Sequence, residues 1–307
     1  MEKTKNFVRS DIQRIKKMNK VKEYAFFYGL LLIPILHWLT FWVYVNLNSF
    51  LLPFQDTITR EFTWANFEFV FELFKTGGEL VIAFKNTLIY YISGLIQSFV
   101  IALLFSYFLF KKILGYRIYA VVFMLPSIIS SVIMISIYKN LLGANGPIAM
   151  LYEKLTGETM PFLLYSEKTA TWTIVAYGVW IGFGMNLILY SGALAKIPPE
   201  VIESTQLDGV GFFREFISIE LPMIWPTISI TLLLGVNGIF MASGPILMFT
   251  EGMYETMTID YWFYEKVIME NNYGVASAFG LLLTLAGAPL TIFVQWIRHK
   301  LPSDVQY

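Results

Sequence analysis

Residues of the types that most often act in catalysis or metal binding are sparse in this chain, and those present are not spaced as in a catalytic or metal site. Cysteine is absent, so the chain has no disulfide, no thiolate metal site and no cysteine nucleophile. The two histidines, His37 and His299, are far apart, and neither has a partner at the spacing of metal ligands. We expect them to serve packing or interfaces and expect no bound metal. Because H-E-x-x-H and G-x-S-x-G sequences are also missing, an enzymatic function has the least support.

Phosphate chemistry is likewise missing from the chain itself. No G-x-x-x-x-G-K-[ST] sequence occurs, so the chain lacks the glycine-rich loop that cradles the phosphates of ATP. We therefore expect this chain to bind no cofactor. The formal net charge is zero, which gives no overall basic field of the kind that attracts nucleic acid.

One acidic segment of the chain spans residues 195–222. It contains two basic residues, Lys196 and Arg214, against five acids, which are Glu200, Glu203, Asp208, Glu215 and Glu220. A group of acids this dense in one short segment indicates either a water-facing connection or a surface that binds a partner.

The prolines and the glycine of this segment predict a short helix over residues 199–209. Pro198 and Pro199 suit the first turn of a helix, where no amide donor is needed. Gly209 suits the left-handed position directly after a helix end. Asp208 can accept bonds from the amides of the following turn and so start a second helix, before Pro222 opens the next apolar stretch. On physical grounds alone, a well-capped connecting loop whose acids face water is an equally good interpretation.

Long apolar stretches surround this segment and predict an all-α membrane protein. Of the 307 residues, 56% are hydrophobic and 14% are charged, whereas a soluble domain has about 25% charged residues. A helix needs about 20 mostly apolar residues to cross a bilayer. Six stretches meet this requirement and predict six transmembrane helices, at residues 24–47, 86–110, 119–138, 171–194, 223–248 and 276–296.

The distribution of Lys and Arg predicts how these spans are oriented. Residues 1–23 hold eight Lys/Arg and three acids, and we interpret them as a cytoplasmic basic arm that precedes a six-span domain over 24–307. With the N-terminus inside, the segments on the cytoplasmic side hold 15 Lys/Arg and those outside hold 7. We therefore expect a multi-pass protein of the cell membrane with both termini and the 197–222 loop in the cytoplasm.

The 197–222 loop resembles the EAA motif of ABC-importer permeases, which is E-A-A-x-x-D-G-A followed by F-x-x-I-x-L-P. The matching residues are Glu203, Asp208, Gly209, Phe216, Ile219, Leu221 and Pro222. Ser204, Thr205 and Val210 stand in place of the three alanines, and Glu220 stands where Thr is common. Upstream, residues 192–198 resemble the G-A-L-x-x-I-P stretch of sugar permeases.

Three further stretches extend the resemblance over residues 80–300. Asn86-Thr87-Leu88 is similar to the N-T-L that opens the second span in these permeases. Residues 123–126 are similar to the F-L-P of the third span, and residues 180–183 to the W-x-G-F of the fourth. The pattern is most similar to sugar-importer permeases of the maltose and glycerol-phosphate transporter type. It implies the type I ABC-importer permease fold.

The resemblance also implies a function, which is that of the pore-forming subunit of an ATP-driven importer for a sugar or oligosaccharide. The implied partners are a second, homologous permease, two ATP-binding-cassette ATPases that hold ATP-Mg, and an extracellular solute-binding protein. The 199–209 helix would dock on one ATPase, and the acidic excess of the loop suggests a partly basic docking groove there. The residues implied in coupling are Glu203, Asp208, Gly209, Phe212, Phe216, Leu221 and Pro222.

The fourth and fifth spans flank the loop, and we expect the solute to pass along them. For their glycines, close helix packing is the favoured alternative. The asparagines are better candidates, because an amide inside a membrane needs a partner. The candidate residues of the solute path are Trp180, Gly182, Asn186, Tyr190, Asn237, Gly238 and Ser243.

The kind of solute is predicted from what the spans lack. A cationic solute would favour acids within the membrane and an anionic one would favour Arg or Lys, so spans with neither indicate a neutral solute. An importer of polyamine, phosphate or another small polar solute stays open as an alternative. A channel or secondary transporter that works alone would leave the 197–222 loop unexplained.

Overall fold

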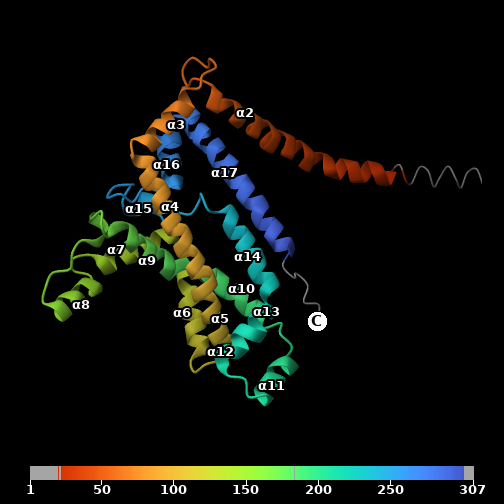
Figure 1. Ribbon diagram of the computed structural model, residues 1–307, viewed down its shortest axis with the longest axis vertical. Coiled ribbons are helices and arrows are strands. Elements are labelled where there is room, and N and C mark those ends of the chain that lie inside the picture. The colour runs from red at the N-terminus through yellow and green to blue at the C-terminus, as the bar shows by residue number, and fades with distance from the viewer. Residues whose placement is uncertain (1–19, 21, 183, 301–307) are drawn as a thin grey trace, which may run out of the picture.

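The computed structural model describes residues 20, 22–182 and 184–300. This part of the chain is helical and contains no β-strand, only an isolated bridge between Gln55 and Phe62. The all-α prediction is therefore confirmed. Figure 1 shows an elongated arrangement in which α3 (Ala65–Lys75) lies at one end and α11 (Pro199–Leu207) at the other.

Among the described residues, four helices are long and apolar enough to cross a membrane, and they coincide with the first, second, fourth and sixth predicted spans. They are Lys22–Phe54, Glu79–Phe110, Ala170–Leu194 and Tyr273–Ile297. Within them lie η1 (Leu39–Tyr44), α2 (Val45–Leu51), η2 (Leu52–Phe54), α4 (Glu79–Leu95), η3 (Ile96–Ile101), α5 (Ala102–Phe110), α9 (Ala170–Gly182), α10 (Gly184–Leu194) and α17 (Tyr273–Lys300). The six-span prediction is met if two further helix pairs, both bent, each count as one span.

The first bent pair contains the third predicted span. Its helices Tyr116–Ile128 and Ser131–Thr156 meet at 108°. Pro126 lies inside the first of them, two residues before its end, and its ring blocks the regular hydrogen-bond ladder there. The elements of this pair are α6 (Tyr116–Ile128), α7 (Ser131–Leu142) and α8 (Pro147–Thr156).

The second bent pair contains the start of the fifth predicted span. Phe212–Met223 and Trp225–Val236 meet at 72°, next to Pro222 and Pro226, which lack amide donors. This pair consists of α12 (Phe212–Glu215), η5 (Phe216–Glu220), α13 (Leu221–Met223) and α14 (Trp225–Asn237). The prediction that the span reaches residue 248 is wrong, because α14 ends at Asn237 and a largely non-helical stretch follows, with Gly238, Gly244 and Pro245 in it.

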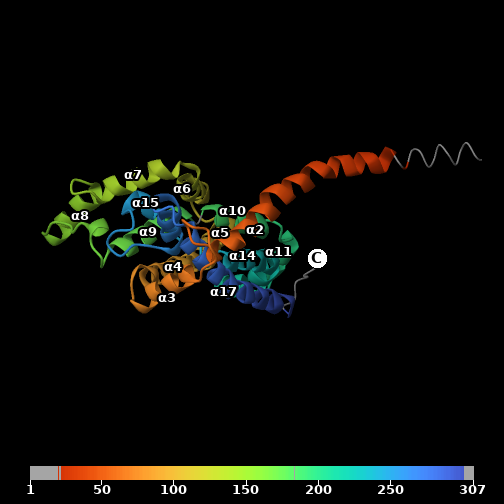
Figure 2. The same ribbon diagram turned by 90° about the horizontal axis from the view of Figure 1, so that it is seen from above.

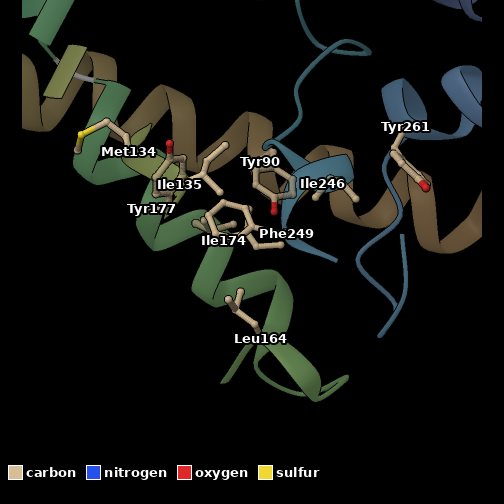
Figure 3. Close-up of a cluster of buried hydrophobic side chains, with 10 residues drawn as sticks. Tyr90, Met134, Ile135, Leu164, Ile174, Tyr177, Ile246, Phe249 and Tyr261 are labelled. Carbon is tan, nitrogen blue, oxygen red and sulfur yellow. The ribbon is translucent and has the colours of Figure 1, made fainter. Parts of the chain in front are cut away.

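Short helices cover the end of the molecule that lies opposite α11. Besides α3 they include η4 (Leu163–Tyr165), α15 (Ile246–Phe249), α16 (Ile259–Tyr264) and η6 (Glu265–Met269). A buried apolar cluster joins them to the spans. Figure 3 shows this cluster, to which α4, α7, α9 and α15 contribute Tyr90, Met134, Ile135, Ile174, Tyr177, Ile246 and Phe249.

Two polar residues at the start of the second span hold the covering loop in place. The Asn86 side chain donates hydrogen bonds to the carbonyls of Glu255 and Met257, at 2.6 and 2.8 Å. The Thr87 hydroxyl accepts a bond from the amide of Ile259 at 2.9 Å. The N-T-L stretch therefore has a structural purpose, which is to satisfy buried backbone groups of a loop far away in sequence.

The first helix leaves the rest of the molecule. Figures 1 and 2 both show it running away from the bundle beyond its contact with α17. None of its most apolar window is buried against the chain. Most of its side chains are therefore left uncovered by the described part of the chain.

Candidate functional site

The predicted short helix of the 197–222 loop is present as α11. Pro198 is its N-cap residue and Pro199 its first residue, as their missing amide donors favour. Gly209 follows the helix end with φ +67°, a conformation that glycine adopts without strain. The amide of Val210 returns to the Thr205 carbonyl at 3.3 Å and closes the turn. The helix and its glycine stop are thus confirmed.

The second helix of the loop begins differently from the prediction. It starts at Phe212 after Gly211, and no side chain caps it. Asp208 was expected to supply that cap, but its backbone instead continues the end of α11, with its amide bonded to the Ser204 carbonyl. Its side chain is exposed to solvent.

The five acids of the loop divide into two groups. Glu200, Glu203 and Asp208 belong to α11 or its end and are exposed. Glu215 and Glu220 are buried and form ion pairs with Lys111, which directly follows α5. The water-facing interpretation therefore holds for three acids only.

The predicted coupling residues Phe212 and Phe216 face α5. The Tyr107 hydroxyl donates a hydrogen bond to the Phe212 carbonyl at 2.8 Å. The Tyr107 ring lies 4.6 Å from the Phe212 ring and 4.5 Å from the Phe216 ring, between centroids. Aromatic packing of this kind fixes the second half of the loop to the end of the second span.

The part of the loop from α11 to the start of α12 combines charged side chains, exposed apolar side chains and a hollow. Leu207 is 88% exposed and Phe213 is 65% exposed, which is unusual for large apolar side chains. Beside them lies a hollow of about 410 Å³. Its lining includes both carboxylate-bearing and apolar side chains, namely Glu200, Val201, Ser204, Thr205, Asp208, Val210 and Ile219. Such a surface suits a protein partner with basic and apolar groups.

Between the spans, one predicted path residue lines a cavity. Asn186 donates a hydrogen bond to the Ser98 hydroxyl at 2.9 Å, and both line a cavity of about 210 Å³ together with Tyr91 and Thr231. Tyr91 and Ser98 come from the second span and were missed by reasoning on the sequence. Their hydroxyls, seven residues apart, lie on one face of a helix, which is a signal the sequence does contain.

The other predicted path residues do not meet at this cavity. Tyr190 is buried, with its hydroxyl 3.1 Å from that of Thr231. Gly182 lies against the end of the Gln97 side chain of the second span, where an added Cβ would need that flexible side chain to shift.

The remaining path residues lie near the upper end of α14 or against the covering helices. Trp180 packs against the Tyr138 ring, with 6.0 Å between centroids. Ser243 lies 2.7 Å from the Thr258 hydroxyl, and Gly238 ends α14. The side chain of Asn237 lies outside the described structure.

Comparison with known proteins identifies the class. Residues 94–303, which include the 197–222 loop, match the model of the binding-protein-dependent transport system inner membrane component family. The chain belongs to this family. As an inner membrane component of such a transport system it is a multi-helix membrane protein, and the resemblance of its loop to the EAA motif is thereby explained.

Two relatives of this inner membrane component are named as permeases of sugar transport systems. It is 26% identical over 226 residues to the multiple sugar-binding transport system permease protein MsmF of Streptococcus mutans, a match that covers 71% of this chain and 77% of the relative. It is 23% identical over 302 residues to the arabinooligosaccharides transport system permease protein AraP of Halalkalibacterium halodurans, which covers 93% of both chains.

A solved structure shares the fold. It is a bacterial ABC transporter involved in the import of the acidic polysaccharide alginate, one chain of which superposes with a TM-score of 0.80 at 21% identity. The superposition covers 93% of this chain and 99% of that chain. This chain therefore has the fold of one chain of that transporter.

Proposed function

We propose that this chain is the pore-forming permease subunit of an ATP-driven importer for a sugar or oligosaccharide. The observation that carries the proposal is α11, a short helix bounded by proline and a left-handed glycine that presents acids and the exposed side chain of Leu207. The sugar assignment is supported by the names of the relatives, MsmF and AraP, and by the lack of acids and of Lys or Arg in the predicted spans.

In this proposal α11 docks in a groove of a cytoplasmic ABC ATPase. Leu207 and Phe213 are the apolar anchors, because large side chains that enter a partner's pocket carry most of the energy of an interface. Glu200, Glu203 and Asp208 surround them and fit basic residues on the ATPase. ATP-Mg is bound and hydrolysed by the ATPases.

Transport follows from movement of this docked helix. Closure of the ATPases displaces α11, and the rigid turn at Gly209 passes the displacement to the second half of the loop. The spans then exchange between outward-open and inward-open states, an alternating access between two global states. The bends near residues 129 and 224 are natural hinges for this change.

The remaining partners complete the importer. A second, homologous permease supplies the other half of the pore, and the unburied first helix offers it a large apolar surface within the bilayer. An extracellular binding protein delivers the solute at the end covered by α3 and α16. The α11 end and both termini are cytoplasmic.

Co-purification tests this proposal. The chain is tagged, extracted from its own membrane in mild detergent and isolated with everything it binds, and the components are identified by mass spectrometry. We expect a second permease and an ATPase, and a solute-binding protein whose bound ligand is a sugar. A chain that is isolated alone and transports in proteoliposomes without any ATPase would refute the proposal, whereas a non-sugar ligand would change the solute alone.

A further inference from the structure

One basic side chain faces the 197–222 loop from another helix. Lys111 directly follows α5, and its Nζ lies 2.7 Å from a carboxylate oxygen of Glu215 and 2.9 Å from one of Glu220. The Glu220 side chain is fully buried, while the side chains of Lys111 and Glu215 are 15% and 7% exposed. Water screens these buried charges little, so the attraction between them is stronger than in an ion pair at the surface.

The two carboxylates depend on this one cation. Glu215 and Glu220 form ion pairs with Lys111 and, within the described chain, with no other basic side chain. Lys111 also lies at the C-terminal end of a helix, where unpaired carbonyls favour a positive charge. Glu220 is the position at which the loop departs from the Thr of the EAA pattern, and a buried acid there requires such a partner.

A second contact of the same helix supports this arrangement. Tyr107 lies one turn before Lys111, bonds the Phe212 carbonyl and packs on the rings of Phe212 and Phe216. The Lys111 Nζ is 5.4 Å from the centroid of the Tyr107 ring. Charge, hydrogen bonding and aromatic packing thus act together between the end of α5 and residues 212–220, which lie side by side at the lower end of Figure 1.

We propose that Lys111 is a positioning residue that ties the 197–222 loop to the second span, so that displacement of α11 is passed to α5. The chain itself connects α11 only to the fourth and fifth spans. Lys111 adds a route to the helix Glu79–Phe110, on which the cavity residues Tyr91 and Ser98 lie. This inference rests on the proposed function and adds to it a residue outside the loop.

The test measures solute uptake and ATP hydrolysis together, with the complete transporter in proteoliposomes. The decisive variant is the neutral triple Lys111→Met/Glu215→Gln/Glu220→Gln, which removes the ion pairs without leaving a buried charge alone. Lys111→Arg keeps the positive charge, and Lys112→Met removes the adjacent, exposed lysine as a matched control.

We expect the triple variant to keep its ATPases bound and to hydrolyse ATP but to move about tenfold less solute per ATP, a loss within the range of couplings between distant sites. Lys111→Arg and Lys112→Met should retain the wild-type ratio. A triple variant with the wild-type ratio, or an equal loss in Lys112→Met, would overturn the proposal. If the single variant Lys111→Met fails to assemble with its partner subunits, the neutral triple variant still tests the proposal.

Spin labels provide a readout that does not depend on transport. The chain has no native cysteine, so Ser218→Cys and Leu114→Cys, both at exposed positions, place one label on each side of the contact. The distance distribution should be narrow in the parent and in Lys111→Arg and should broaden in the triple variant. An unchanged distribution in the triple contradicts the proposal. A wild-type complex without ATP-dependent uptake would instead refute the proposed function, while the labels still report whether Lys111 holds the loop.

Discussion

At the scale of single residues, the 197–222 loop separates positions that shape it from positions that meet a partner. Gly209 belongs to the first group, because its φ of +67° is available to glycine and closed to proline. Leu207 belongs to the second, since the described part of the chain leaves it 88% exposed. Substitution of the first kind should impair coupling, and substitution of the second kind should weaken binding of the ATPase.

Gly209→Pro should abolish the turn that ends α11 and uncouple ATP hydrolysis from uptake, with the protein still present in the membrane. Gly211→Ala is the matched control, because Gly211 has an extended backbone and open space around its Cβ position. Uptake and ATPase activity of the reconstituted complex give the measurement. Normal uptake by Gly209→Pro with full ATPase assembly would rule out the coupling role.

Leu207→Ala should weaken binding of the ATPase by about tenfold, since an anchoring side chain at an interface contributes 1 kcal/mol or more. Leu114→Ala removes another almost fully exposed leucine outside α11 and should leave the affinity unchanged. Titration of the purified ATPase into nanodisc-embedded permease measures both. Equal affinities for wild type and Leu207→Ala would remove Leu207 from the interface.

At the scale of elements, the ends of α11 could be predicted from adjacent residues, whereas contacts between residues far apart in sequence could not. The bounds of α11 follow from adjacent prolines and one glycine, and the sequence contains these signals in place. The partner of Glu220 lies on another helix far away in sequence, and no periodicity reveals such a pairing. The fifth span was predicted too long because its apolar composition continues past Asn237, whereas backbone conformation at the following glycines ends the helix.

The loop that covers the spans depends on Asn86. Asn86→Ala should lower the free energy of unfolding by about 1–3 kcal/mol, because two partly buried carbonyls lose the hydrogen bonds that the Asn86 side chain donates. Asn86→Asp should cost more, since a carboxylate would face the same two carbonyl oxygens. Asn46→Ala, which removes an exposed bond to the residue's own helix, is the control. Thermal unfolding in detergent measures all three, and equal midpoints for Asn86→Ala and wild type would contradict the role.

Glu265, in η6 outside the predicted spans, predicts a pH dependence. Burial raises the pKa of Glu265, the nearby Glu79 carboxylate raises it further, and one of its own oxygens is buried without a hydrogen bond. A raised folded-state pKa means that ionisation destabilises the fold at neutral pH, and this cost disappears below the ordinary Glu pKa of about 4.3. Glu265→Gln should therefore raise the unfolding midpoint at pH 7.5, with the gain vanishing near pH 4. The exposed Glu61→Gln should show no such trend, and a pH-independent gain in Glu265→Gln would exclude this cause.

At the scale of the whole molecule, composition predicted a helical membrane protein, and the family match supports that class. The apolar surfaces that the described chain leaves exposed indicate that it has partners. The first helix is apolar and unburied, and at the far end Leu207 of α11 and Phe213 of α12 are exposed. Both features are expected of one subunit of a larger assembly, and neither of them identifies the solute.

In the proposed importer, ATP hydrolysis on partner subunits drives solute through this chain. The most direct test is uptake of the binding protein's own ligand by proteoliposomes that contain the complete complex, with and without ATP. We expect uptake that requires both ATP and the binding protein. The Gly209→Pro variant should show no such uptake. Uptake at the same rate without ATP would contradict the proposed importer.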